Sequence, residues 1–230
     1  LKVGGIILFA RNIQSRNQVR QLCRDAQDCA RAFGQPPLLI AVDQEGGSVA
    51  RLKAPDFEEF PDAAVIGGKP GAQRFARKTA EDLADAGINM NMAPVMDVAD
   101  PAMDSIMARR AYGRDPHVVA DLGTAVIGGL QQHRIMAVAK HFPGIGRTTI
   151  DSHIDRPDVH TPLHDLWARD LIPFQAAVDN RVAGIMLSHI RYAAFDPEWP
   201  ASLSSAVADD LLRKQMGYDG LVMTDDLEMG

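Results

Sequence analysis

Six short apolar runs recur along the chain, and each is followed by a polar loop and then by a segment with helical periodicity. The runs are nearly continuous in Val, Ile, Leu, Met and Ala, which is typical of strands buried on both faces of a parallel sheet. They cover residues 5–9, 38–42, 88–95, 135–139, 182–187 and 220–223. Six β-then-α units in a row predict an α/β protein, built either as a doubly wound sheet or as a (β/α)8 barrel.

The segments between the runs carry recognisable helix ends. Ser15 can cap a helix that runs to about residue 33, and Asp115 followed by Pro116 can open a helix that runs to about residue 133. Further helices are expected over about 70–86, 162–180 and 204–216.

Polar residues just after the strands help to choose between the two architectures. They follow nearly every run, at Arg11, Asp43, Asp97, Lys140, Ser188 and Asp225. A barrel gathers all its strand ends around one mouth, whereas a doubly wound sheet concentrates its ligand at one switch point. No Gly-x-Gly-x-x-Gly follows a strand, which weakens a dinucleotide-binding interpretation. We therefore expect a TIM-type (β/α)8 barrel and a single domain over residues 1–230.

Composition excludes several classes of partner. The net charge is −6 and no basic tract is present, which argues against nucleic acid or an anionic membrane. No apolar run approaches the roughly 20 residues of a membrane span. Cys23 and Cys29 lie six apart in a segment of helical character, about 9 Å along the axis and too far for a disulfide within one helix. Two reduced thiols predict a reducing compartment, and hence a cytoplasmic protein.

The last strand ends at Thr224-Asp225-Asp226. A carboxylate at the carboxyl end of a barrel strand is held rigidly towards the mouth, which suits a nucleophile or a stabiliser of positive charge. The alternative is that one of the two aspartates only caps the next helix.

An Asp-x-His pair, Asp151 and His153, lies in the long loop after Lys140-His141. Residues two apart in an extended segment project to the same side, so the carboxylate could accept a hydrogen bond from the imidazole and raise its pKa. Such an imidazole can give and take a proton near pH 7. The alternative is an ordinary pair on a surface loop.

Donors and acceptors for a sugar are available at the same end of the predicted barrel. Lys140 and His141 could hydrogen-bond hydroxyl groups, Asp43 offers an acceptor, and Arg51 and Arg110 could add charged donors. Zinc binding is the competing use of polar residues at this end, with His141, His153, His189, Asp43 and Asp225 as the possible ligands. No two of these histidines have the His-x-His or His-x-x-x-His spacing that would support it. We expect neither a metal nor a cofactor.

Together, five motifs resemble the β-N-acetylglucosaminidases of glycoside hydrolase family 3. The motifs are Ala41-Val42-Asp43-Gln44-Glu45-Gly46-Gly47, Asn91-Met92-Ala93-Pro94-Val95-Met96-Asp97-Val98, Lys140-His141-Phe142-Pro143-Gly144, Asp151-Ser152-His153 and Thr224-Asp225-Asp226-Leu227-Glu228-Met229. They occur in order along essentially the whole chain. The family fold is a TIM-type barrel, and the resemblance implies that this chain lacks the first and last β/α units of that barrel.

The resemblance implies a role for each matching residue. Asp225 corresponds to the nucleophile, and His153 with Asp151 to the acid/base pair on a mobile loop. The clamp on the N-acetylglucosamine ring corresponds to Asp43, Arg51, Arg110, Lys140 and His141. The Asp-x-His pair separates this branch from the β-glucosidases of the family, which take a Glu from elsewhere as acid/base. Two positions depart from the family pattern, because Ser48 replaces a common Arg and Ile145 a common His.

The resulting hypothesis is a retaining exo-β-N-acetylglucosaminidase that acts on small carbohydrates, namely cell-wall fragments released during peptidoglycan recycling. A β-N-acetylglucosaminide phosphorylase and a family 3 β-glucosidase are the alternative enzymes. A sugar-binding barrel without turnover is the alternative from another class.

Overall fold

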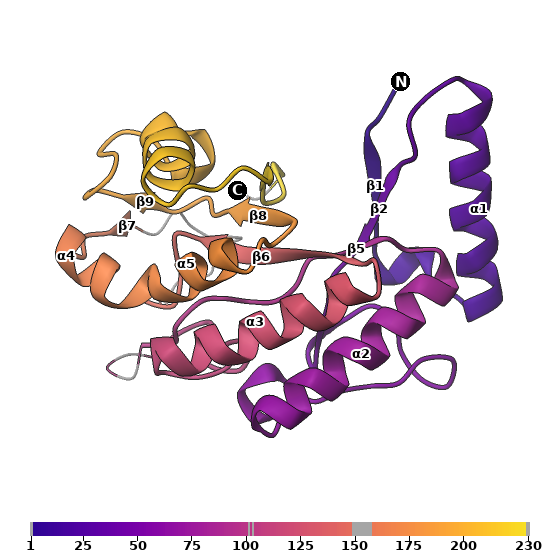
Figure 1. Cartoon of the computed structure of the whole chain (residues 1–230), viewed down its shortest axis with the longest axis horizontal. Helices are drawn as coiled ribbons and strands as arrows, with labels where there is room; N and C mark the ends of the chain where they lie inside the picture. Colours follow the sequence, from indigo (N-terminus) through magenta and orange to yellow (C-terminus); the bar gives the residue numbers. More distant parts are fainter. Residues whose placement is uncertain (1, 101, 103, 149–157, 229–230) are drawn as a thin grey trace.

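A six-stranded parallel sheet forms the centre of the molecule (Figure 1). In the computed structural model, which describes residues 2–100, 102, 104–148 and 158–228, its strands lie side by side in chain order. They are β1 (Gly5–Leu8), β2 (Leu39–Val42), β5 (Met90–Asn91), β6 (Met136–Phe142), β8 (Gly184–Leu187) and β10 (Leu221–Thr224). Each falls within or across a predicted apolar run, so the strand predictions are confirmed.

The helical segments between the strands follow one another around the outer side of the curved sheet (Figure 1). They are α1 (Arg16–Ala32), α2 (Gly68–Ala86), α3 (Pro116–Gln132), α4 (Leu163–Asp165), the π-helical segment η3 (Leu166–Asp170), α5 (Ile172–Asp179) and the π-helical segment η5 (Ala206–Gln215). Helix α1 packs on α2, α2 on α3, and α3 on α5. Within the described residues, no helix combines the length and the apolar character needed to cross a membrane.

Short elements decorate the loops between these units. They are η1 (Ala10–Asn12), β3 (Gln44–Gly46), β4 (Val49–Ala50), η2 (Ala63–Val65), β7 (Asp158–Val159), β9 (Arg191–Tyr192) and η4 (Ala201–Leu203). Strands β3 and β4 pair as an antiparallel hairpin directly after β2.

The predicted helix starts are confirmed by their capping hydrogen bonds. The Ser15 hydroxyl accepts from the backbone N–H of Gln18 at 3.3 Å. The Asp115 carboxylate accepts from the N–H groups of His117 and Val118, at 2.8 and 3.3 Å. Both caps satisfy first-turn donors that have no partner inside the helix.

The expected TIM-type (β/α)8 barrel is wrong. In the described residues β1 pairs with β2 and β10 with β8, and these two edge strands do not pair with each other. The sheet is an open, half-barrel layer of six strands, because closure requires every edge to find a partner at a matching tilt and stagger. The strand order does not reverse either, so the sheet is not doubly wound.

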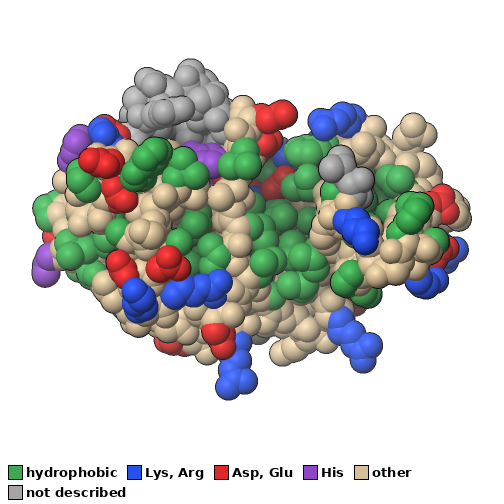
Figure 2. Space-filling model, turned by 90° about the horizontal axis from the view of Figure 1, so that it is seen from above, with side chains coloured by type: hydrophobic (Ala, Val, Ile, Leu, Met, Phe, Trp, Pro, Cys, Tyr) green, Lys and Arg blue, Asp and Glu red, His purple; other side chains and the backbone are tan. Residues whose placement is uncertain are grey.

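The two faces of the sheet are packed differently. The outer face and the helices enclose the large hydrophobic core, which contains the edge-to-face pair Phe142 and Phe174. The inner, concave face carries a second, smaller cluster with the methionines Met90, Met92 and Met186. Seen from above, hydrophobic side chains line the hollow on this side of the molecule (Figure 2).

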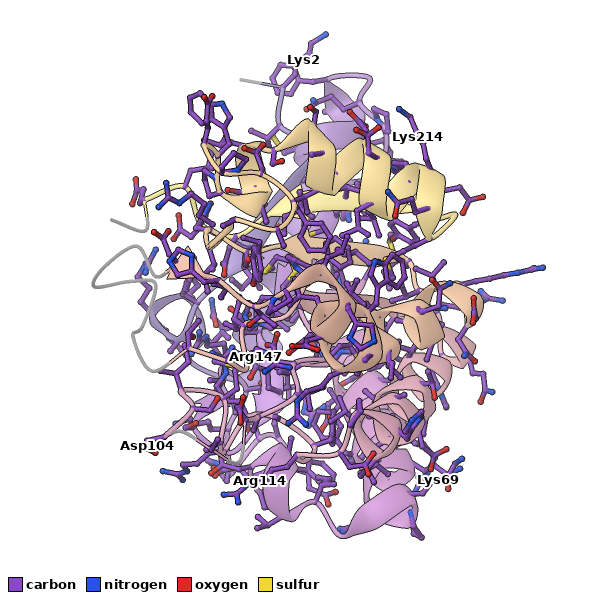
Figure 3. The ribbon with its side chains drawn as sticks, turned by 90° about the vertical axis from the view of Figure 1, so that its left-hand side faces the viewer. Lys2, Lys69, Asp104, Arg114, Arg147 and Lys214 are labelled. Carbon is purple, nitrogen blue, oxygen red and sulfur yellow. The ribbon has the colours of Figure 1, made fainter. Side chains whose placement is uncertain are left out.

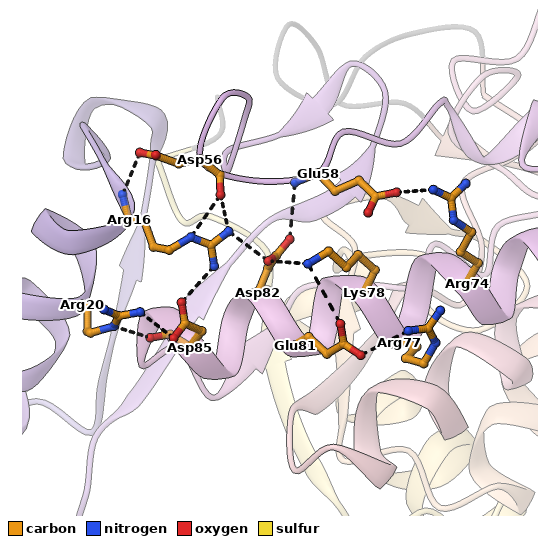
Figure 4. A network of polar contacts seen from close by, with 10 residues as sticks. All are labelled: Arg16, Arg20, Asp56, Glu58, Arg74, Arg77, Lys78, Glu81, Asp82 and Asp85. Carbon is orange, nitrogen blue, oxygen red and sulfur yellow. Dashed lines mark hydrogen bonds and ion pairs between the residues drawn. The ribbon is translucent and has the colours of Figure 1, made fainter.

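An ion network on the outer side joins α1, α2 and the loop after β4 (Figure 4). Asp82 lies at its centre and contacts Arg16 and Lys78, each at 3.1 Å. Arg16 also pairs with Asp85 at 2.9 Å, and its backbone N–H donates to Asp56 at 2.9 Å. The network fixes the first two helices relative to each other.

Candidate active site

A cavity of about 800 Å3 is lined by residues from the carboxyl ends of several strands. Its charged and polar lining residues are Arg11, Asp43, Glu45, Arg51, Arg110, Lys140, His141, Thr224, Asp225, Asp226 and Glu228. Its apolar lining residues are Ile7, Phe9, Val49, Met92, Ile106, Met107, Ile145, Met186 and Met223. The structure therefore brings together the sequence-predicted residues Asp43, Arg51, Arg110, Lys140, His141 and Asp225. Asp151 and His153 lie outside the described residues.

Lys140, at the end of β6, is buried with its ammonium between two carboxylates. Its Nζ lies 2.8 Å from Asp43 Oδ1 and 2.7 Å from Glu45 Oε1. Burial alone would lower the pKa of Lys140, but Glu45 and Asp43 raise it above its ordinary value. The side chain therefore stays charged and acts as a hydrogen-bond donor at the cavity wall.

Arg110 and Glu45 form a two-point ion pair. Arg110 Nε donates to Glu45 Oε2 at 2.9 Å, and Nη2 donates to Oε1 at 2.8 Å. Burial alone would raise the pKa of Glu45, but Lys140 and Arg110 lower it to about 2. Such bidentate pairs fix both the position and the plane of a guanidinium group.

His141 is oriented by Asp97, which is fully buried. His141 Nδ1 lies 2.7 Å from Asp97 Oδ2, and Asp97 Oδ1 accepts from the backbone N–H of Ile145 at 2.8 Å. Because a carboxylate only accepts, Nδ1 carries a proton. Nε2 lies 3.4 Å from Arg110 Nη2, which only donates, so this nitrogen is placed to accept. The contacts favour the neutral imidazole protonated at Nδ1.

Asp43, directly after β2, has a partner on each oxygen. Oδ1 contacts Lys140, and Oδ2 lies 3.4 Å from Arg51 Nη2. Burial would raise the pKa of Asp43, but the effect of Lys140 and Arg51 outweighs burial and lowers it. Asp43 is therefore an anionic acceptor held at the cavity wall.

Asp225 follows β10 and lies in a turn that is fixed at several points. Its backbone N–H donates to Leu187 O at 3.1 Å, and its Oδ1 accepts from the Asp226 N–H at 2.9 Å. His189 Nε2 lies 2.9 Å from the carbonyl oxygen of Asp226, so Nε2 is the protonated nitrogen. His189 Nδ1 faces the Ser202 hydroxyl at 2.7 Å. The strand and His189 together hold the carboxylate turn at the cavity.

Ser48, at the position where the resemblance leads us to expect an Arg, is hydrogen-bonded to Asp62. The Asp62 carboxylate accepts from Ser48 N at 2.9 Å and from Ser48 Oγ at 3.3 Å. The guanidinium of Arg109 donates to the same carboxylate at 2.7 Å. Gly47 has φ +53°, and a Cβ atom there would lie 1.8 Å from Asp62 Oδ1, so the turn requires glycine. Asp62 thus joins the β3–β4 hairpin to the segment that carries Arg110.

The loop after β6 is anchored even though Ile145 replaces a common His. Tyr192 is buried and its hydroxyl donates to Gly144 O at 2.9 Å. Arg147, labelled in Figure 3, donates to Asp170 at 2.8 Å and to Asp100 at 3.3 Å. These bonds, with the Ile145 N–H on Asp97, fix residues 144–148.

Two residues of the cavity network, Glu45 and Asp97, had no predicted role. Glu45 could have been found from its spacing, because Asp43 and Glu45 are two apart in an extended segment and project to the same side. Asp97 was recognised as a polar residue at a strand end, but no local signal pairs it with His141. Among residues with a described placement, no group of three or more His, Cys, Asp and Glu side chains could hold a metal ion.

The model for the glycosyl hydrolase family 3 N-terminal domain matches residues 1–230. The chain belongs to this family. It is 38% identical over 236 residues to a β-hexosaminidase from Nitrosomonas eutropha, and the matched region covers 99% of this chain and 66% of that protein. It is 36% identical over 232 residues to a β-hexosaminidase from Pseudomonas aeruginosa, with 99% and 67% covered.

Solved structures of family 3 proteins have the same fold. A β-N-acetylglucosaminidase from Paenibacillus matches with a TM-score of 0.93 and 39% identity, over 99% of this chain and 44% of that one. NagZ from Neisseria gonorrhoeae matches with a TM-score of 0.90 and 33% identity, over 99% and 68%. The chain thus spans about two thirds or less of the length of most of these relatives.

Proposed function

We propose that this glycosyl hydrolase family 3 protein is a retaining exo-β-N-acetylglucosaminidase. The observation that carries the proposal is the arrangement of the cavity, in which the strand-end carboxylate Asp225 lines the same space as the clamp of Asp43, Arg110, Lys140 and His141. The clamp offers fixed donors and acceptors for ring hydroxyls, and Asp225 supplies a nucleophile. The names of the relatives support N-acetylglucosamine as the sugar.

In the proposed reaction, Asp225 attacks the anomeric carbon while the bond to the leaving oxygen breaks. Protonated His153 gives its proton to that oxygen, and Asp151 holds the imidazole. Neutral His153 then takes a proton from water, which attacks the glycosyl-enzyme and releases the sugar with its original configuration. The roles of His153 and Asp151 rest on the family resemblance and on their spacing.

The experiment is hydrolysis of 4-nitrophenyl N-acetyl-β-glucosaminide, with the matching β-glucoside as a control substrate. We expect turnover of the first and at least a hundredfold lower kcat/KM on the second. Equal rates would favour the β-glucosidase alternative, and no turnover on either would favour a sugar-binding protein. Added methanol should give the methyl β-glycoside, whereas the α-anomer would contradict a retaining mechanism.

The phosphorylase alternative is tested in the same assay by adding inorganic phosphate. Arg110 and Lys140 are both paired with carboxylates, which leaves this part of the cavity poorly suited to an anion. We expect phosphate to leave the rate unchanged and N-acetylglucosamine to be the product. Formation of N-acetylglucosamine 1-phosphate would contradict the hydrolase proposal.

As natural substrates we propose N-acetylglucosaminyl fragments of peptidoglycan, handled in the cytoplasm. The family resemblance supports the substrate. Both cysteines are free thiols, which suits a reducing compartment. Incubation with N-acetylglucosaminyl anhydromuropeptides should release N-acetylglucosamine, detected by mass spectrometry. Intact fragments after prolonged incubation would exclude this substrate.

A further inference from the structure

Glu45 occupies the centre of the polar network and has no assigned role in the proposed reaction. Its side chain is buried, and its two oxygens receive three donors from two cations. Arg110 supplies two of these donors and Lys140 the third. The same two cations are the clamp members expected to hydrogen-bond the sugar ring.

We propose that Glu45 is the positioning residue of the clamp, which sets the directions in which Arg110 and Lys140 present their remaining N–H groups. The proposal rests on the proposed function. It adds that recognition of the ring depends on a carboxylate that acts through the two cations, because its own oxygens are already occupied.

The contacts show which N–H donors of Arg110 and Lys140 remain for a ligand once both have bonded to Glu45. Arg110 uses Nε and one N–H of Nη2 on Glu45, and Nη2 also faces His141 Nε2 at 3.4 Å. The Nη1 amino group of Arg110 takes part in none of these contacts and is the group that remains for a ligand. Lys140 has three N–H donors and uses two on Glu45 and Asp43, which leaves one. Flexible Lys and Arg side chains would otherwise distribute these donors over many rotamers.

The hairpin after β2 explains why Glu45 itself is well placed. In β3 the neighbouring Gln44 side chain turns away and accepts from the N–H groups of Arg51 and Leu52, at 2.8 and 3.0 Å. The following Gly46 has φ +100°, and a Cβ there would lie 2.7 Å from Pro61 O. The backbone on both sides of Glu45 is therefore fixed before any ligand arrives.

Two substitutions separate positioning from simple charge balance. Glu45→Gln removes the charge and replaces one acceptor oxygen by an NH2 group that faces donors. Glu45→Asp keeps the charge but is shorter by one methylene and cannot reach both cations in the same way. We expect kcat/KM to fall roughly ten- to a hundredfold in both variants, with most of the loss in KM. A Glu45→Asp variant with the parent's kcat/KM would overturn the proposal.

A matched control is available in the outer ion network (Figure 4). Asp82 is also buried, at 5% exposure against 6% for Glu45, and also contacts one Arg and one Lys, but it does not line the cavity. Asp82→Asn should lower the melting temperature as Glu45→Gln does and leave kcat/KM of the folded protein unchanged. An equal loss of kcat/KM in both variants would mean that Glu45 acts only through stability, which overturns the proposal.

A crystal structure of the Glu45→Gln variant gives a result that does not depend on turnover. We expect the guanidinium of Arg110 and the Nζ of Lys140 to move by more than about 1 Å. If both stay in place, the positioning role is overturned whatever the kinetics. If they move in a protein whose parent hydrolyses no N-acetylglucosaminide, the positioning role stands and the proposed function alone fails.

Discussion

Replacing Asp97 by Asn is expected to change which nitrogen of His141 carries the proton. The Asp97 carboxylate is fully buried and accepts three N–H groups, from His141 Nδ1 at 2.7 Å, His141 N at 3.3 Å and Ile145 N at 2.8 Å. The introduced amide has one accepting oxygen and one donating NH2 group. One orientation sets the NH2 group against His141 Nδ1, and the other sets it against the backbone N–H groups.

The first orientation keeps the backbone bonds and forces the imidazole proton from Nδ1 to Nε2. The Nε2–H group then faces Arg110 Nη2, another donor, at 3.4 Å. The variant loses a hydrogen bond to a charged group, worth about 1.5–3 kcal/mol. We therefore expect kcat/KM to fall roughly ten- to a hundredfold. For a chain of this size the melting temperature should fall by roughly 3–12 °C.

Two measurements check this prediction. Nitrogen-15 NMR of the imidazoles reports the tautomer of His141, and the exposed His133, whose Nδ1 contacts Gly129 O at 2.8 Å, serves as an internal reference. Steady-state kinetics and thermal unfolding give the two losses. A His141 ring still protonated at Nδ1, together with kcat/KM within threefold of the parent, would refute the proposed role of Asp97.

Four further outcomes are expected. Asp225→Ala should abolish hydrolysis while the unfolding free energy changes by less than about 1 kcal/mol, as steady-state kinetics and urea unfolding can check. Activity of this variant within tenfold of the parent would contradict the nucleophile assignment. His153→Ala should slow hydrolysis of a 4-nitrophenyl glycoside much less than that of a natural disaccharide, and azide should partly restore turnover; equal losses without an azide effect would assign the proton transfer to another group. The lowered pKa of Glu45, about 2, gives roughly 3 kcal/mol of stabilisation that is present above about pH 4.5 and is lost as the pH falls towards 2. The difference in unfolding free energy between the parent and Glu45→Gln should therefore shrink over that pH range in urea titrations. A difference that stays constant would contradict this prediction. Gly47→Ala should cost roughly 1–3 kcal/mol in thermal unfolding because of its φ of +53° and the nearby Asp62, and an unchanged melting temperature would show that the turn adapts.

The order and type of the main elements could be predicted from the sequence because they depend on local signals. An apolar run such as 182–187 leads to β8, and caps such as Ser15 and Asp115 mark helix starts that the structure contains. Segment 162–180 was expected to be one helix, but it is divided into α4, the π-helical η3 and α5. No local pattern signals that change of winding.

The overall shape of the sheet could not be predicted in the same way, because it depends on whether β1 and β10 reach each other across the molecule. The composition of a strand carries no information about that distance. The resemblance to a family of barrels therefore led to the wrong expectation for this chain, although each strand in it was placed correctly.

The candidate site shows the same division between local and long-range information. Asp43, Lys140 and Asp225 were selected because they follow strands, and parallel strands bring their carboxyl ends together. The pairing of Glu45 with Arg110 joins residues 65 apart in the chain, and that of Asp97 with His141 joins residues 44 apart. Such partners become evident only when the loops are folded.

The matched charges of the clamp have a consequence for the medium in which the protein can work. Lys140 and Arg110 each face the carboxylate of Glu45 at hydrogen-bonding distance, where Lys140 and Glu45 are buried and the Arg110 side chain is 25% exposed. Dissolved ions screen charges over a Debye length of about 8 Å at physiological ionic strength, and they act weakly on buried pairs in contact. Each of these two cations thus presents oriented N–H groups while its charge is offset at contact distance, so the hold of Lys140 and Arg110 on an uncharged sugar should depend little on the salt concentration.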